Sequence, residues 1–263
     1  MSAEHLLAAL TAALALPDSS RVDQRVPKKM LVEHGAPTAA DKRLLNDGLE
    51  DIQWLAALKP STVAVPEYRD AQREYLEVAV LSAKVRDTHV RPAQLQRLTE
   101  LIHRAIPYPV WLMLASGQTI HVSLVHKRAA LNNAKTKDAT KLVLEEELFN
   151  LPLTEEVPTL QDLLASLALH RQAGQHLHAL YQSWIDCLIA AQAARITGHF
   201  ALPDAPEQAA ARHQALRACQ ALEEEASRLT TLANKEKQIA RLVELNLALQ
   251  QVQSALNDAR AQL

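Results

Sequence analysis

The chain has 263 residues, of which 48% are hydrophobic, and its formal net charge is −2. It can therefore bury a sizeable core, but its net charge excludes binding to nucleic acid or acidic membrane by overall charge alone. Cys187 and Cys219 are the two cysteines, too few for a disulfide framework or a four-ligand zinc site. The five glycines are unclustered, which excludes a phosphate-binding loop and a dinucleotide-binding fingerprint.

The first segment is apolar but lacks the pattern of a secretory signal. Leucines recur on one face of a helix expected over 4–16, and Glu4 and His5 stand where a signal peptide would be basic. No run approaches the roughly 20 apolar residues that span a bilayer. We therefore expect a cytoplasmic protein with no membrane partner.

A polar, basic stretch follows Pro17, and then a capped helix is predicted. Thr38 with Asp41 three residues later matches a helix-capping pattern. Aliphatic residues at helical spacing continue from Leu44 to Leu55, so the helix is expected to run until Pro60 ends it.

The next segment predicts a small sheet with one more helix. Pro92 suits the first turn of that helix, and Ser116-Gly117-Gln118 predicts the turn of a hairpin. The expected elements are a short strand at 62–65, a strand at 75–85, a helix at 92–105, and strands at 110–115 and 119–126. A polar loop is expected over 132–140, while 141–148 fits a strand or a helix.

From about residue 155 the pattern becomes helical. Thr159 with Asp162 repeats the capping pattern, and leucines at helical spacing continue to about Ile196. Gly198 and Pro203 predict a break, after which Asp204 is expected to cap a new helix.

The last 57 residues, from Glu207 to Leu263, contain no glycine or proline and would measure about 85 Å as one helix. Aliphatic residues here alternate spacings of three and four, as in a coiled coil. This aliphatic seam consists of Leu242, Leu245, Leu249, Val252, Leu256 and Leu263. An earlier run is out of phase with it across 234–238, which fits a register shift in one helix or the bend of a helical pair. The seam is expected either to fold back within the chain or to bind a partner helix or second copy.

The predicted fold class is therefore α+β. A small mixed sheet with packed helices forms the N-terminal half, and an all-α half with a coiled-coil-like helix follows. The expected domains are an α/β domain at 1–154, a helical segment at 155–202, and a long helix or helical hairpin at 203–263.

The sequence contains no pattern that assigns a catalytic residue, a cofactor or a metal site. A metal-dependent nuclease would need an acidic-x-lysine pair, but Glu77 and Lys84, the nearest residues after Asp70, are seven positions apart. His170, His176 and His178 lack the spacing of three or four that helical metal ligands need. No Gly-x-Ser-x-Gly elbow is present.

Five basic residues are the candidates for contacts with nucleic-acid phosphates. They are Arg25, Lys28, Lys29, Lys127 and Arg128. The alternative for these five is an ordinary solvated surface. Trp54, Trp111 and Trp184 lie in apolar patterns and are expected in the core.

Several short motifs resemble a bacterial family, domain-of-unknown-function family 4391, in their order along the chain. They are Arg25-Val26-Pro27-Lys28, the stretch 41–54, Ala105-Ile106-Pro107-Tyr108-Pro109, Lys127-Arg128, 235–238 and 243–246. Members of the family are typically encoded beside helicases and DNA methyltransferases in restriction-like or phage-defence gene clusters. The resemblance implies no catalytic residues.

We therefore expect a non-catalytic accessory or adaptor subunit of a bacterial anti-phage or restriction-like DNA-defence complex. It would assemble through its C-terminal helices with a protein partner, such as a helicase or methyltransferase subunit, or as a homo-oligomer. The first alternative is a nucleic-acid-binding protein that contacts DNA through basic residues of the α/β domain. The second is a divergent metal-dependent nuclease.

Overall fold

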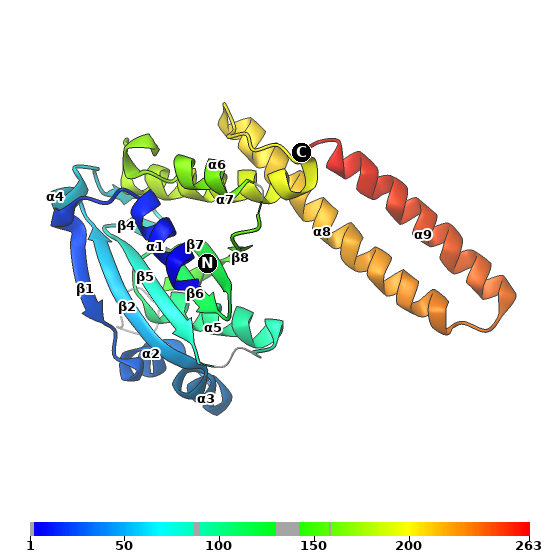
Figure 1. The fold of residues 1–263 in the computed structure, drawn as a ribbon, viewed down its shortest axis with the longest axis horizontal. Coiled ribbons are helices and arrows are strands. Elements are labelled where there is room, and N and C mark those ends of the chain that lie inside the picture. The colour runs from blue at the N-terminus through cyan, green and yellow to red at the C-terminus, as the bar shows by residue number, and fades with distance from the viewer. Residues whose placement is uncertain (1–2, 87–89, 130–141, 158) are drawn as a thin grey trace. The chain divides into compact units, whose positions relative to one another are not determined.

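The computed structural model describes residues 3–86, 90–129, 142–157 and 159–263 (Figure 1). By its internal contacts the chain divides into two units, Met1–Leu188 and Ile189–Leu263. A mixed sheet with helices forms the N-terminal half and helices form the C-terminal half, so the predicted fold class is confirmed. No helix in these described ranges has the length and apolar character to cross a membrane.

The first unit is built on a six-stranded sheet in the order β1-β2-β5-β6-β7-β8. These strands are β1 (Arg21–Arg25), β2 (Leu49–Leu58), β5 (Val78–Val85), β6 (Val110–Ser116), β7 (Thr119–Ala129) and β8 (Leu142–Leu153). Among them β5 and β6 pair in parallel and the other neighbours are antiparallel. A parallel pair needs a crossover, which α5 (Pro92–Ala105) supplies. The strands β3 (Tyr68–Arg69) and β4 (Glu74–Tyr75) pair separately.

Helices cover both faces of the sheet (Figure 1). On one face lie α2 (Lys28–Gly35), α3 (Ala39–Gly48) and α5, and on the other lie α1 (Ala3–Ala13), α6 (Leu160–Ser166) and the first part of α7 (Leu177–Thr197). Leu81 and Leu112 pack toward the first face, whereas Trp111 meets Trp184 of α7 with ring centroids 5.1 Å apart. Burial on both faces explains why the central strands are almost continuously apolar.

The helix predicted from Thr38 to Pro60 is correct at its start and wrong at its end. Thr38 Oγ1 accepts a hydrogen bond from Asp41 N at 3.1 Å, as the capping pattern predicts. However, α3 ends at Gly48 and β2 begins at Leu49. The pairing of β2 with β5 is irregular at two points, after Leu49 and after Trp54. Such bulges interrupt the two-residue period of a strand. The buried residues of β2 therefore lie three and four positions apart, which is the spacing expected of a helix.

Other predictions have mixed outcomes. The helix at 92–105 and the hairpin around Gly117, whose φ is +60°, are confirmed, and 142–153 proves to be a strand. The strand at 62–65 is wrong, because Thr62 Oγ1 accepts from Lys59 N and caps the short α4 (Pro60–Val63). The strand expected at 75–85 divides into β4 and β5. The loop expected at 132–140 lies outside the described residues.

Two short 3-10 helices complete the first unit, and an antiparallel hairpin dominates the second (Figure 1). The 3-10 helices are Asp18–Ser20 and Leu169–Arg171. The hairpin consists of α8 (Pro206–Lys235) and α9 (Ile239–Arg260). The chain therefore turns at 236–238, where the sequence pattern changes phase, instead of continuing as one helix. The N-cap of α8 is Ala205 and not the predicted Asp204.

Candidate functional site

The most unusual polar group of the first unit is the buried ammonium of Lys127. This side chain enters from β7 and is 2% exposed. Its Nζ donates to the carbonyls of His103 and Ile106, each at 2.6 Å, and to that of Tyr108. The last carbonyls of a helix have no partner inside the helix. Lys127 therefore caps the C-terminal end of α5 from a neighbouring strand.

Burial governs the electrostatics around Lys127. It lowers the pKa of Lys127 to about 7, because a low-dielectric interior disfavours the charged form. The three carbonyl acceptors act in the opposite direction, since an ammonium can donate to all three and a neutral amine cannot. The neighbouring His103 is fully buried, and burial together with the charge of Lys127 holds its pKa well below the usual value. His103 is therefore neutral.

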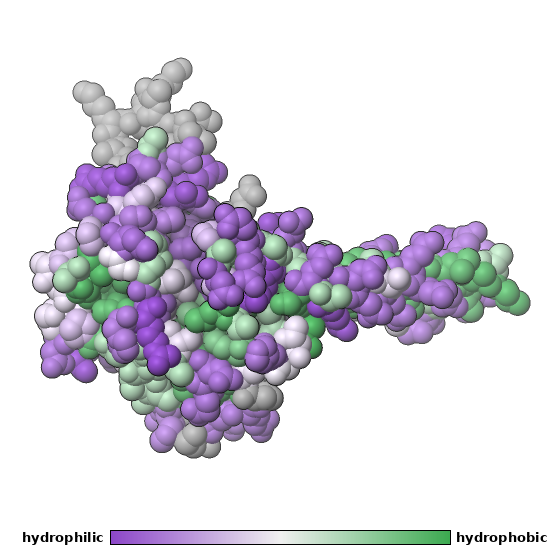
Figure 2. Space-filling view, turned by 90° about the horizontal axis from the view of Figure 1, so that it is seen from above, coloured by the Kyte–Doolittle hydropathy of each residue, from purple (hydrophilic) through white to green (hydrophobic). Residues whose placement is uncertain are grey.

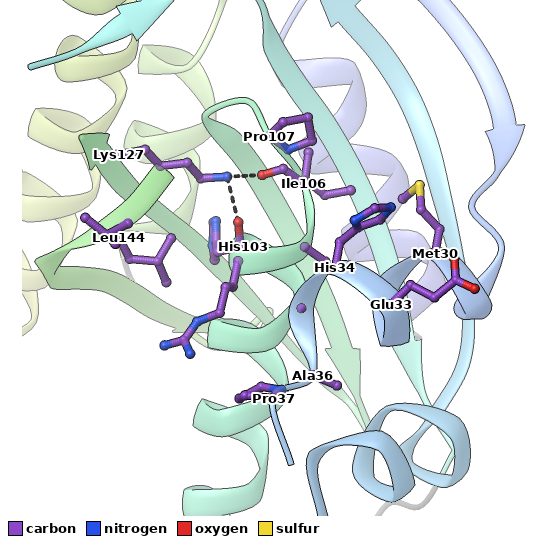
Figure 3. A pocket seen from close by; sticks show the side chains of 14 residues that line it. Met30, Glu33, His34, Ala36, Pro37, His103, Ile106, Pro107, Lys127 and Leu144 are labelled. Carbon is purple, nitrogen blue, oxygen red and sulfur yellow. Dashed lines mark hydrogen bonds between the residues drawn. The ribbon is translucent and has the colours of Figure 1, made fainter. Parts of the chain in front are cut away.

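A pocket of about 810 Å³ opens beside these two residues (Figure 3). Its walls come from the end of α2 and the following loop, the end of α5, β7 and β8. Figure 3 shows Lys127 and His103 on one side and Met30, Glu33 and His34 on the other. All three hydrogens of the ammonium already have acceptors, so in its protonated form Lys127 contributes a positive charge to this pocket and not a free nucleophile.

His103 also pairs with a serine, but the pair does not have the geometry of a catalytic triad. His103 Nε2 lies 2.9 Å from Ser123 Oγ, and both residues are fully buried. His103 Nδ1 has no hydrogen-bond partner within the described ranges. A triad needs a carboxylate or amide at that nitrogen and access for substrate. The pair instead links α5 to β7 through the core.

The structure separates the five predicted nucleic-acid contacts. Arg25, Lys28 and Lys29 gather at the start of α2, whereas Lys127 lies in the core and the half-buried Arg128 follows it on β7. An ammonium in the core cannot reach a phosphate group.

The three cations near α2 already have local partners. Arg25 pairs with Asp51 at 2.7 Å and Lys29 with Glu33 at 3.8 Å. Lys28 donates to the carbonyl of Leu49, and burial, together with Arg86 and Arg25, lowers its pKa.

The residues considered for a nuclease lie apart. Glu77 precedes β5 and pairs with Lys59 at 3.0 Å, and Lys84 near the other end of β5 pairs with Glu50 at 3.3 Å. Seven strand positions correspond to about 23 Å. Asp70 accepts from two backbone N–H groups in the β3–β4 turn. Among the described residues no group of three His, Cys, Asp or Glu side chains could hold a metal ion.

The predicted aliphatic seam lies between the two helices of the hairpin. Leu256 and Ala259 of α9 form a buried cluster with Cys219 of α8, and Arg260 donates to Glu223 at 2.8 Å. The other seam residues are half-buried, namely Leu242, Leu245, Leu249, Val252 and Leu263. Most of the surface that these residues could offer to a partner helix is therefore used within the hairpin.

A second aliphatic stripe on α9 faces solvent. Its residues alternate with those of the seam along the chain, so the sequence does not separate the two. Ile239, Val243 and Leu247 are 80%, 52% and 57% exposed, and Leu232 at the end of α8 is 42% exposed. A spacing of four places the three α9 residues on one face. These four residues are called the tip patch here. In Figure 2 the far end of the hairpin carries hydrophobic colour.

Together these features define a mixed α/β protein with a helical hairpin, a lysine-capped helix and an exposed apolar patch. The chain belongs to the family described as "Domain of unknown function (DUF4391)", whose match covers residues 14–256. The family expected from the short motifs is thereby confirmed. No curated protein and no solved structure matches the chain.

Proposed function

We propose that this protein is a non-catalytic accessory subunit that binds a protein partner through the tip patch. The observation that carries the proposal is the exposure of Ile239, Val243 and Leu247 on one face of α9. Scattered exposed aliphatic residues are ordinary, but a contiguous apolar patch usually marks an interaction site. Ile239 begins α9 directly after the turn at 236–238, and Val243 and Leu247 follow it on the same face of the helix.

The chemistry of the patch defines the kind of partner. A row of aliphatic side chains at helical spacing fits a hydrophobic groove between helices of another protein. Lys235, Lys237, Arg241 and Glu244 are exposed around it and supply a polar rim of mixed charge, as protein interfaces commonly have.

The biological setting of the proposal rests on the family resemblance. Since members are typically encoded beside helicases and DNA methyltransferases, we propose that the partner is such a subunit in a cytoplasmic anti-phage or restriction-like complex. The hairpin would hold that enzyme, while the α/β unit would supply the folded body of the accessory subunit.

The test is co-purification of the tagged full-length chain from its native host, followed by reconstitution with the purified partner. Replacing Ile239, Val243 and Leu247 with serine should weaken binding of the helicase or methyltransferase at least tenfold, because the apolar contact is lost. Light scattering of the same samples distinguishes a second copy of this chain from a different partner.

Gln250 and Gln253 are also exposed on α9, and the matched control replaces both with serine. This variant should bind as the unmodified chain does. If the serine variant of the tip patch retains full affinity, the proposed interface is wrong. If the captured protein is unrelated to DNA metabolism, the defence assignment is wrong while the interface stands.

A further inference from the structure

The hairpin β3–β4 stands outside the main sheet and is attached to the start of α7 through aromatic rings. Tyr68 lies over His176 and His178, with ring centroids 4.5 Å and 4.9 Å apart. Tyr75 meets His178 edge-on at 4.9 Å. Leu177 N donates to Pro66 O at 2.8 Å and adds a backbone connection. The imidazoles of His176, which directly precedes α7, and of His178, in its first turn, thus hold this hairpin.

A third imidazole supports the contact from the sheet. His126 of β7 stacks on His178 with centroids 5.1 Å apart and planes at 22°. Its Nε2 lies 2.8 Å from Gln182 Oε1, and Tyr75 Oη meets its Nδ1. Since the amide oxygen only accepts, the neutral ring carries its hydrogen on Nε2 and accepts from the tyrosine at Nδ1. A second proton on His126 would therefore displace the hydrogen bond from Tyr75.

The carboxylates near His126 and His178 only partly offset the effect of burial on the protonation of these two rings. In the β3–β4 hairpin Arg73 is a cation, and it pairs with Glu145 of β8 at 2.6 Å. Asp70 accepts from Tyr68 Oη, and Asp186 of α7 accepts from Gln182. Asp70 raises the pKa of His178 and Glu145 raises that of His126, but burial lowers both pKa values by more.

Arg128, on β7, is a further cation that acts on Glu145. Protonated imidazoles at this place would face each other and Arg73.

Burial, followed by the charges of His126 and Arg73, lowers the pKa of His178 to about 4, from an ordinary value of 6.5. Burial likewise lowers the pKa of His126. These histidines therefore bind protons more readily when the β3–β4 hairpin is detached from α7 than when it is in contact with it. The contact is fully stable above about pH 6.5 and becomes less stable as the pH falls toward 4.

We propose that His126 and His178 form a proton-sensitive latch, and that mild acid releases the β3–β4 hairpin from α7 while the main sheet stays folded. The device goes beyond the accessory role and does not depend on it. Its parts are a hairpin without main-sheet pairing and a contact made by stacked neutral imidazoles. Release exposes the rings of Tyr75 and His178.

Hydrogen exchange of the full chain at pH 7.5 and pH 5.0, with intrinsic rates corrected for pH, tests the latch. A pKa change from 6.5 to about 4 favours opening by about 25-fold at pH 5.0 relative to pH 7.5. Amides in 66–76 should therefore lose protection by about that factor, while β5 should stay unchanged. Equal protection of 66–76 at both pH values, or equal loss in β5, would overturn the proposal.

Two further readouts make the assignment specific. His178→Phe keeps an aromatic contact but cannot be protonated, so most of the pH effect should disappear. His170→Phe, at an exposed position, should leave the effect intact. A histidine NMR titration of the unmodified chain needs no variant. The His178 ring must change charge in the pH interval where 66–76 opens, and a different interval contradicts the latch.

Discussion

The geometry around Lys127 explains why this position needs a lysine. Three carbonyls, from His103, Ile106 and Tyr108, surround one ammonium. A tetrahedral ammonium has three donors that can diverge toward three acceptors, whereas a planar guanidinium directs its donors in one plane. The interaction joins the end of α5 to β7, the strand beside the edge strand β8.

Replacing Lys127 with methionine should lower the free energy of unfolding by about 2–3 kcal/mol, because a buried polar group that loses its hydrogen-bond partner costs about 1–3 kcal/mol. Methionine roughly keeps the volume, so the main loss comes from three carbonyls left without a donor. Urea denaturation measures the effect. Lys42→Met, at an exposed position, should change stability by less than about 0.5 kcal/mol. A loss below about 1 kcal/mol for Lys127→Met would show that the contact contributes little.

Residue-scale features of the candidate site were only partly predictable from the sequence. Trp111 and Trp184 are fully buried, as their apolar surroundings predict. Lys127 next to Arg128 looked like a pair of surface cations, because a sequence does not show that three carbonyls converge at one point. The prolines at 107 and 109 were the available signal, since they end α5 and leave its last carbonyls in need of another donor.

At the scale of elements, the close approach of α2 and α5 depends on Gly35. A Cβ at this position would lie 2.6 Å from Leu101 O and 2.7 Å from Ala105 Cβ. Both distances are shorter than nonbonded contacts allow, and one neighbour is backbone. The two helices can therefore pack at this distance because the position has no side chain.

Gly35→Ala should destabilise the protein by about 1–3 kcal/mol, as overpacking of a dense core usually does. Thermal unfolding followed by circular dichroism measures the change. Gly174→Ala provides the control, because no atom lies within 4 Å of the added Cβ. The control should unfold within a degree or two of the unmodified chain. An unchanged or raised melting temperature for Gly35→Ala would mean that the helices separate without cost.

Elements with regular periodicity were predictable, and irregular ones were not. The apolar face and first-turn proline of α5 gave its bounds correctly. The sequence of the bulged strand β2 predicted a helix, because the register irregularities place its buried residues three and four positions apart. The strand β1 is almost entirely exposed, so it carries no alternation from which a strand could be recognised. Its position depends on pairing with β2.

At the scale of the whole molecule, the two units differ in how much they bury. The first contains a three-layer core with Trp111 and Trp184 buried in it. Trp54, also expected in the core, is half-buried and packs against it, and these three are all the tryptophans of the chain. In the α8–α9 hairpin, by contrast, few large side chains are fully covered, among them Leu216, Leu229 and Leu256. Regions with few buried apolar contacts open at lower free energy than dense cores.

Urea unfolding should therefore give different curves for two probes. Tryptophan fluorescence reports on the first unit, while far-ultraviolet circular dichroism reports on all helices. The dichroism signal should begin to fall at lower urea, which is the usual sign of more than two states.

Leu256→Ala, a truncation of a buried leucine, should shift only this early phase, and Leu247→Ala, at a 57% exposed position, should shift neither. Superimposable curves would mean that the units unfold together.

The order of strands in the main sheet has a consequence for the chain as it leaves the ribosome. From β1 to β8 each successive strand of this sheet lies beside the strand made just before it. No later strand must enter between two that are already joined, so each can be added at a free edge while synthesis proceeds. Domains commonly form in this direction during translation. The nascent sheet grows outward from β1, and its latest edge stays open until the next strand arrives.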